Sequence, residues 1–232
     1  MKKLVVLSGS GISAESGLKT FRDMGGLWEQ YDVTEVASPE AWERDPELVL
    51  RFYNERRRQL LNSEPNAGHK ALEELESHFD VQIVTQNVDD LHERAGSTRV
   101  LHLHGEIRKA RSTGDASLVY NIEGAELNLG DRCEKGYQLR PHVVWFGEAV
   151  PAISEAARLV EQADIFAVVG TSLAVYPAAG LVYYADSSIP FFLVDPGTQE
   201  PPRSENIHFI REKASTGVPK MKDILVNQYA KS

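Results

Sequence analysis

Short apolar runs alternate with helical patterns along most of the chain. Continuous apolar runs bounded by turn residues are typical of strands that are buried on both faces. Such runs occupy residues 4–7, 81–85, 165–169, 191–194 and 207–210. Apolar residues at helical spacing occupy 46–62, 67–79 and 154–163, and further helices are expected after Pro177 and Pro219. This alternation predicts an α/β fold with a mainly parallel sheet and helices on both faces.

Two segments interrupt the alternation. Residues 21–62 are a glycine-broken loop followed by helices without strands, and residues 106–141 are polar, glycine-rich and short of apolar side chains. Only residues 117–120 carry a weak strand signal there, so we expect a poorly cored excursion. We interpret both segments as insertions that form a small lobe. The main domain then comprises residues 1–20, 63–105 and 142–232.

The first apolar run leads into a glycine-rich turn. Gly9, Gly11 and Ala14 match the loose pattern G-x-G-x-x-G/A between a strand and a helix. Glycines let the backbone approach a ligand closely, and the N–H groups at the start of a helix attract a pyrophosphate. An ordinary tight turn is the alternative. A dehydrogenase is disfavoured, because the acids about 20 residues further on, Glu29 and Asp32, fall in the first insertion.

Polar residues follow several of the predicted strands. They are residues 8–11, 86–89 and 170–172, together with His104 at the end of a strand predicted over 99–104. In open α/β sheets, ligands bind beyond the carboxyl ends of the strands, which meet at one edge. The pattern therefore predicts a ligand site at this edge of the sheet.

His104 is the candidate base at this edge. An imidazole titrates near neutral pH and can take a proton from a group within hydrogen-bond reach. A structural histidine is the alternative, and for Asn87 and Asp89 the alternative is a turn after a strand. A metal site at His102 and His104 is disfavoured, because the sequence places no third histidine nearby and has only one cysteine.

Composition narrows the class of partner. Of 232 residues, 42% are hydrophobic and 25% are charged, and the net charge of −9 disfavours nucleic acid as a partner. One cysteine excludes an internal disulfide framework, and no apolar run is long enough for a membrane span or a signal-peptide core. We expect a soluble, cytoplasmic protein. The basic run at 56–58 is expected on the solvated face of a helix.

Six segments follow one another along the chain in an order that is far more specific than any single segment. They read GSGISAESG, FRDMGGLW, TQNVDDLHERAG, HLHGE, RPHVVWFGE and GTSLAVYPA. In this order they resemble the successive motifs of the sirtuins, which are NAD-dependent protein lysine deacylases, over the chain from about Val5 to Pro219. The resemblance implies a Rossmann-like domain and a smaller lobe, with NAD and an acyl-lysine peptide meeting between them.

The resemblance also implies roles for individual residues. His104 takes the place of the general base, which deprotonates a hydroxyl of the nicotinamide ribose, while Asn87 and Asp89 orient the ribose and the carboxamide of NAD. The acyl-lysine peptide is expected to pair with a strand formed by Val144, Trp145, Phe146, Gly147 and Glu148. Further NAD contacts are implied at Gly9, Ser10, Gly11, Ile12, Ser13, Glu15, Phe21, Arg22, Gln86, Gly170, Thr171, Ser172, Asp195 and Ala214.

Three features depart from the family pattern. Sirtuins usually hold a structural zinc with four cysteines, whereas this chain has only Cys133, with Ser112 and Gly136 near other expected positions. No zinc and no other metal is therefore predicted. Ser10 stands where the family generally has alanine, and Asp195 lacks the asparagine that often precedes the acid by two residues.

Tyr53 and Arg56 lie three residues apart in a predicted helix and so share one face. They resemble the Tyr-x-x-Arg pair of sirtuins that accept succinyl- and malonyl-lysine. A guanidinium fork binds a carboxylate bidentately, and the phenol adds one donor. The alternative is that Tyr53 and Arg56 are simply exposed on an ordinary helix. We expect Arg57 and Arg58 to be exposed in this way.

We therefore expect an NAD-dependent protein lysine desuccinylase and demalonylase with deacetylase activity. It would consume NAD and yield nicotinamide, O-acyl-ADP-ribose and free lysine. The alternatives are a protein ADP-ribosyltransferase that uses the same NAD site and a non-catalytic NAD-sensing module. Acyl-lysine proteins or peptides are the expected partners, neither nucleic acid nor a membrane is expected, and the oligomeric state stays open.

Overall fold

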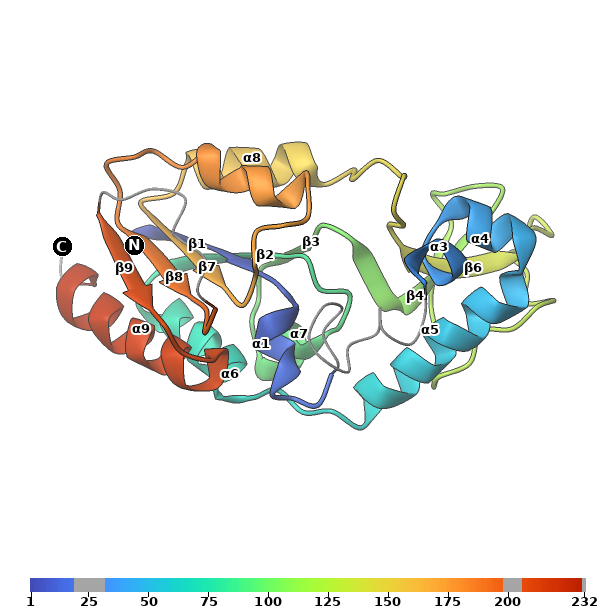
Figure 1. The fold of residues 1–232 in the computed structure, drawn as a ribbon, viewed down its shortest axis with the longest axis horizontal. Coiled ribbons are helices and arrows are strands. Elements are labelled where there is room, and N and C mark those ends of the chain that lie inside the picture. Colours follow the sequence, from blue (N-terminus) through green and yellow to red (C-terminus); the bar gives the residue numbers. More distant parts are fainter. Residues whose placement is uncertain (19–31, 198–205, 231–232) are drawn as a thin grey trace.

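A computed structural model describes residues 1–18, 32–197 and 206–230 of the protein. The larger sheet of this described part has six strands in the order β3-β2-β1-β7-β8-β9, all parallel (Figure 1). The strands are β1 (Lys3–Ser8), β2 (Asp80–Thr85), β3 (Val100–His102), β7 (Ile165–Val169), β8 (Phe191–Val194) and β9 (Ile207–Ile210). The predicted mainly parallel sheet is confirmed.

Helices cover both faces of this sheet, which explains the continuous apolar runs. Leu4 and Val6 of β1 face one core, whereas Val5 and Leu7 face the other, and all four side chains are fully buried. Figure 1 shows α6 and α9 on one side of the sheet and α8 on the other. The elements around the sheet are α1 (Ser10–Ala14), α6 (Ala67–Glu74), η1 (Leu75–Ser77), α7 (Leu91–Ala95), α8 (Ile153–Glu161), η2 (Ala178–Tyr183) and α9 (Ala214–Tyr229).

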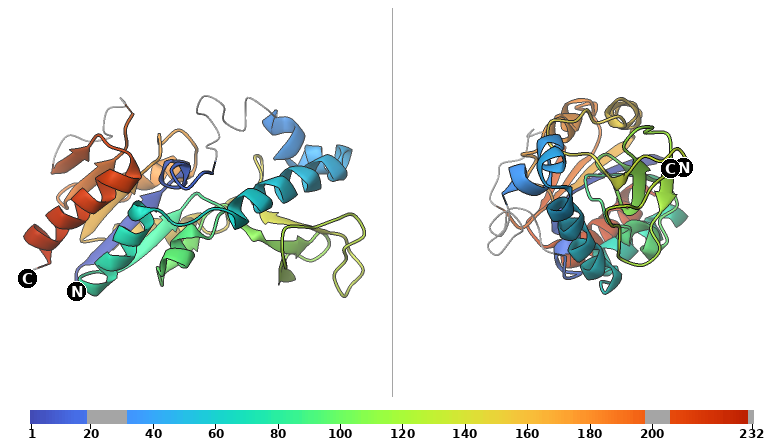
Figure 2. Two further views of the ribbon diagram at one scale, coloured as in Figure 1. Left: turned by 90° about the horizontal axis from the view of Figure 1, so that it is seen from below. Right: turned by 90° about the vertical axis from the view of Figure 1, so that its right-hand side faces the viewer.

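A second, antiparallel sheet lies at the opposite end of the molecule from α9 (Figure 2). It consists of β4 (Gly105–Ser112), β5 (Val119–Asn121) and β6 (Leu139–Val143), in the order β5-β4-β6, and lies beside α3 (Val33–Val36), α4 (Pro39–Arg44) and α5 (Pro46–Leu61). One hydrophobic cluster of these elements contains Leu50 and Ala110, and a second contains Phe52 and Ile107 and extends to Val88 and Leu91 beside the larger sheet. We keep the assignment of residues 21–62 and 106–141 to a separate lobe as a proposal.

The expectation of a poorly cored second insertion was wrong for its first part. β4 is a full strand with Ile107 and Ala110 buried against α5. Its pairing with β6 shifts register between Gly105 and Ala110, so the buried positions do not follow the strict alternation that predicts a strand. The strand expected over 99–104 also ends early, at His102, because the chain turns through Gly105 (φ 79°) into β4.

The last helix begins five residues before the proline that was expected to start it. α9 runs from Ala214 and contains Pro219 in its second turn. Its buried positions Ala214, Val218, Met221 and Leu225 follow helical spacing, so packing on the sheet compensates for the hydrogen bond that the proline cannot donate. Similarly, the helix expected after Pro177 is the 3₁₀ helix η2.

Arg57 corrects the expectation that residues 56–58 form a solvated face. Its side chain is fully buried, and its guanidinium donates to the carbonyl oxygens of Ile107 (2.7 Å) and Ala125 (2.6 Å) and to Asn54 Oδ1 (2.8 Å). Asn54 in turn binds the backbone of Leu127 in both directions, at 3.1 Å each. α5 thus fixes residues 125–127 from inside, whereas Arg58 is exposed and forms an ion pair with Glu126.

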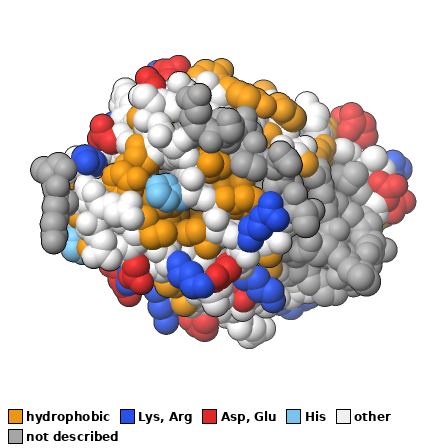
Figure 3. All heavy atoms as spheres, turned by 60° about the vertical axis from the view of Figure 1, so that its left-hand side comes forward, with side chains coloured by type: hydrophobic (Ala, Val, Ile, Leu, Met, Phe, Trp, Pro, Cys, Tyr) orange, Lys and Arg blue, Asp and Glu red, His pale blue; other side chains and the backbone are white. Residues whose placement is uncertain are grey.

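β9 is one of the two end strands of the parallel sheet, and hydrophobic side chains remain partly exposed around it. Figure 3, which turns this side of the molecule forward, shows hydrophobic side chains gathered around a histidine. Partly buried hydrophobic residues of β9 and α9 include Ile207, Phe209, Ile210, Val226 and Tyr229. Within the described ranges, no helix is long and apolar enough to cross a membrane.

Candidate active site

The glycine-rich turn after β1 packs directly against the turn after β7, where the strand order reverses. Gly9 N–H donates to Val169 O at 3.0 Å, and Gly11 N–H donates to Gly170 O at 2.8 Å. A Cβ at Gly9 would lie 2.6 Å from Thr171 Cβ, and one at Gly11 would lie 2.8 Å from Gly170 Cα. Both positions therefore require glycine. The crevice beyond such a reversal is where open α/β sheets bind ligands.

Asn87 connects the loop after β2 to the glycine-rich turn. Its side-chain amide donates to Gly9 O and contacts Ser13 Oγ, both at 3.1 Å. The neighbouring Gln86 reaches the third loop, with its Nε2 3.2 Å from Thr171 Oγ1. Hydrogen bonds from Asn87 and Gln86 thus connect the loops after β1, β2 and β7, whose carboxyl ends were predicted to meet.

Asp89 lies two residues further along the same loop and is buried. Burial raises the pKa of its carboxyl, although hydrogen bonds from Leu91 N–H and Ser13 act in the opposite direction. Ser13 therefore lies within reach of both Asn87 and Asp89, on the first turn after the glycines.

His104 lines the same cavity as Gln86 and Asn87. Its Nδ1 lies 3.0 Å from Gln86 O, and because a carbonyl oxygen only accepts, Nδ1 carries the proton. In the neutral ring the lone pair is then on Nε2. Burial lowers the pKa of His104, which outweighs the hydrogen bond to Gln86, so the ring is a neutral base at physiological pH.

α5 and the segment after β6 also line the cavity, through Tyr53, Arg56 and residues 143–148. Ser10 and Ser172 line it from the turns after β1 and β7. Trp145 Nε1–H donates to the Tyr53 hydroxyl oxygen at 3.0 Å. Burial raises the pKa of Tyr53 to about 12, so the phenol keeps its proton. Burial also lowers the pKa of Arg56, and the nearby Tyr53 and Asp89 act in the opposite direction.

Glu148 is engaged by the protein itself. Its carboxylate accepts from Arg140 (2.7 and 3.1 Å), Arg111 (3.0 Å) and Trp145 N–H (2.8 Å). The Arg140 guanidinium also lies over the Trp145 ring, 3.2 Å from its centroid. Glu148 lines the cavity, and its carboxylate also orients Trp145. Residues 144–148 follow β6 without forming the expected strand, and their contact with a peptide stays a prediction. The sequence analysis did not identify Arg111 and Arg140 as the residues that hold Glu148. Arg140 is the first residue of the matched segment RPHVVWFGE, which was the one available signal, and Arg111 lies in none of the matched segments.

Other predicted cofactor residues lie outside the cavity lining. Glu15 accepts a hydrogen bond from Ser215 N–H (3.0 Å) at the start of α9, where Ala214 is buried, and Ile12 belongs to the core. Asp195 accepts from Gly197 N–H at 2.8 Å after β8. Phe21 and Arg22 lie outside the described residues.

The turn that carries Cys133 is held by hydrogen bonds. Cys133 Sγ lies 3.3 Å from Ser112 Oγ, which accepts from the N–H groups of Gly114 and Asp115 at 3.2 Å each. Asp115 also pairs with Lys135 at 2.7 Å. Across the ranges that the structure describes, no three His, Cys, Asp or Glu side chains gather as metal ligands would. The residues here do not fit a tetrahedral zinc site.

A family model, curated relatives and solved structures were each compared with this chain, and all three indicate the same family. A model of the Sir2 family matches residues 9–177. Proteins named NAD-dependent protein deacylase are similar over nearly the whole chain: one from Bacteroides thetaiotaomicron is 53% identical over 97% of this chain and 99% of its own, and one from Helicobacter pylori J99 is 54% identical over 97% and 94%.

Solved structures agree in fold. A complex of a Sir2 homologue with NAD has a TM-score of 0.86 at 40% identity, covering 97% of this chain and 90% of that one. A Sir2 protein with a deacetylated p53 peptide and 3′-O-acetyl-ADP-ribose has a TM-score of 0.79 at 30% identity, covering 99% and 94%. Together with the strand-end geometry, these matches show that the chain belongs to the Sir2 family, the sirtuins.

Proposed function

We propose that this sirtuin is an NAD-dependent protein lysine deacylase that prefers short acidic acyl groups, succinyl and malonyl, and retains deacetylase activity. The observation that carries the proposal is the position of Tyr53 and Arg56 in one cavity with His104. The names of the relatives and the NAD and peptide complexes of similar proteins support the general reaction. A cytoplasmic location stays a prediction.

NAD, when bound, supplies the electrophilic ribose carbon from which nicotinamide departs. The glycine-rich turn is fixed against the turn after β7 by hydrogen bonds to Val169 O and Gly170 O, and its glycines would let the pyrophosphate approach the backbone closely. Asn87 and Asp89 would hold the nicotinamide ribose beside His104. His104 Nε2, with its proton on Nδ1, would then take the proton of a ribose hydroxyl.

The donors that α5 contributes to the cavity support an acidic acyl preference. Because Trp145 donates to the Tyr53 oxygen, the phenol proton remains available for a carboxylate in the cavity. The Arg56 guanidinium supplies a charged fork beside it. A carboxylate would accept hydrogen bonds from both groups, whereas an apolar acyl chain offers them no acceptor.

Replacing Arg56 by methionine tests this pocket. We expect kcat/KM for a succinyl-lysine peptide to fall about 100-fold or more, because one partner of a buried, hydrogen-bonded charge pair is removed. Deacetylation should change by less than about threefold, since an acetyl group has no charge for Arg56 to bind. The measurement is product formation by mass spectrometry at matched peptide concentrations.

Arg58→Met is the matched control, because Arg58 lies on the same helix but is exposed and paired with Glu126. It should leave both rates unchanged. Equal losses of desuccinylation and deacetylation in Arg56→Met would contradict the acyl assignment and leave only a general role for Arg56.

A further inference from the structure

Two histidines of the HLHG segment bind consecutive carbonyl oxygens of the loop after β2. His104 Nδ1 lies 3.0 Å from Gln86 O, and His102 Nδ1 lies 3.0 Å from Asn87 O. His102 has a second contact: its Nε2 lies 2.7 Å from Glu93 Oε1 on α7. The two rings thus differ in what their second nitrogen does.

Both ring nitrogens of His102 face groups that can only accept. A backbone carbonyl and an ionised carboxylate offer no proton, so both nitrogens donate only when the ring is an imidazolium. The side chain is 9% exposed, so water contributes little to either bond. The two contacts are therefore charge-assisted hydrogen bonds in a partly dry environment.

The charged groups around the ring favour this state. Burial lowers the pKa of His102, but the hydrogen bond and charge of Glu93 outweigh it, with Asn87 O and Glu106 adding to the rise. Glu106, on β4, is itself paired with Lys109 at 2.7 Å. Asp89 lies near the ring, and His92 on α7 is neutral because burial keeps its pKa well below the usual value.

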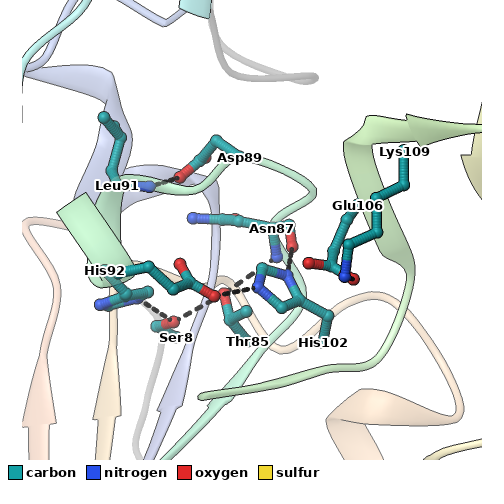
Figure 4. A network of polar contacts seen from close by, with 10 residues as sticks. Ser8, Thr85, Asn87, Asp89, Leu91, His92, His102, Glu106 and Lys109 are labelled. Atoms are coloured by element: carbon teal, nitrogen blue, oxygen red, sulfur yellow. Dashed lines mark hydrogen bonds and ion pairs between the residues drawn. The ribbon is translucent and has the colours of Figure 1, made fainter. Parts of the chain in front are cut away.

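Asn87 is held from every side by this arrangement. Its N–H donates to Thr85 Oγ1 (3.0 Å), its side chain contacts Gly9 O and Ser13, and its carbonyl accepts from His102 (Figure 4). The carbonyl belongs to the peptide unit that leads to Val88 and Asp89. Loss of the His102 contact would free that unit while the side chain of Asn87 keeps its partners.

We propose that His102 is a positioning residue: as an imidazolium between Glu93 and the Asn87 carbonyl, it fixes the loop that carries Asn87 and Asp89 in the NAD site. The inference rests on the proposed use of NAD at that loop. His102 itself touches no reacting atom. When the ring loses its proton, one of the two bonds is lost, and the loop is less well fixed for the nicotinamide ribose.

The test is the pH dependence of the NAD step in wild type and three variants. In the wild type, kcat/KM for NAD should fall at alkaline pH as His102 loses its proton. Glu93→Gln keeps an acceptor but removes the charge, so this fall should move to lower pH by roughly half a unit or more.

His102→Phe should lower kcat/KM for NAD about tenfold to a hundredfold at pH 7, because loose positioning of reacting groups costs rate on this scale. The fall at alkaline pH should be absent from this variant. His102→Asn, which can still donate to Asn87 O, should recover part of the loss. The acidic limb, assigned to His104, should not move.

NAD affinity measured by calorimetry over the same pH range separates this inference from the proposed reaction. If no acyl peptide is turned over but NAD affinity of wild type and Glu93→Gln diverges at alkaline pH, the deacylase proposal fails and the positioning role stands. If Glu93→Gln keeps the wild-type pH profile and NAD affinity, the positioning role is wrong. Because Glu93 is 39% exposed, this variant keeps the test decisive even if His102→Phe does not fold.

Discussion

Replacing His104 by tyrosine is expected to reduce deacylation about 10²–10⁴-fold, the usual contribution of a positioned general base, while NAD still binds. The physical reason is the bond from Nδ1 to Gln86 O, which leaves Nε2 as the acceptor in the cavity. A phenol keeps a proton at neutral pH and cannot take this role. Activity should be measured as deacylated peptide, and NAD binding by calorimetry.

The same arrangement determines the acidic limb of the wild-type pH profile. Because burial lowers the pKa of His104, the ring is neutral at pH 7, and activity should be lost only when the pH falls below the usual range for histidine. His78→Tyr is a suitable control, since His78 is exposed. Turnover that survives in His104→Tyr would show that another group is the base.

Replacing Arg57 by methionine should lower the free energy of unfolding by roughly 3 kcal/mol, because several buried acceptors lose their donor at once. The carbonyl oxygens of Ile107 and Ala125 and the side chain of Asn54 all accept from this one guanidinium. Burial lowers the pKa of Arg57 to about 10, so the group is still charged at neutral pH. Chemical denaturation followed by tryptophan fluorescence is the measurement.

Arg58→Met provides the matched comparison for Arg57→Met. Its exposed ion pair with Glu126 is worth at most about 1 kcal/mol, so the unfolding midpoint should hardly move. Equal effects of the two substitutions would contradict the account of α5 as the element that fixes residues 125–127.

A metal chelator should leave the unfolding midpoint of the wild type unchanged, because hydrogen bonds hold the turn at Ser112 and Cys133.

The parallel sheet could be predicted because burial on both faces leaves a local signal. Leu4, Val6 and their neighbours must all be apolar when helices cover both sides, and such runs are visible without knowledge of the fold. The convergence of Gln86, Asn87 and His104 could also be predicted, since carboxyl ends of parallel strands meet at one edge. The rule concerns strand direction alone and needs no side-chain detail.

The burial of Arg57 and the hydrogen bond between Trp145 and Tyr53 could not be predicted in the same way. The burial of Arg57 depends on Ile107 and Ala125, which lie 50 and 68 positions further along the chain. The bond from Trp145 to Tyr53 spans 92 positions. A helix with three consecutive arginines has no local feature that separates the buried one from the exposed one. These contacts follow from how β4 and β6 pack on α5.

The measurement that tests the proposed function most directly is a comparison of one lysine peptide carrying an acetyl, malonyl or succinyl group, incubated with NAD and followed by mass spectrometry. We expect loss of the acyl group with one O-acyl-ADP-ribose formed per lysine released, and faster reaction with succinyl and malonyl than with acetyl. A faster reaction with acetyl would contradict the role of Tyr53 and Arg56. No acyl loss from any peptide, or a gain of ADP-ribose on an acceptor protein, would contradict the deacylase itself.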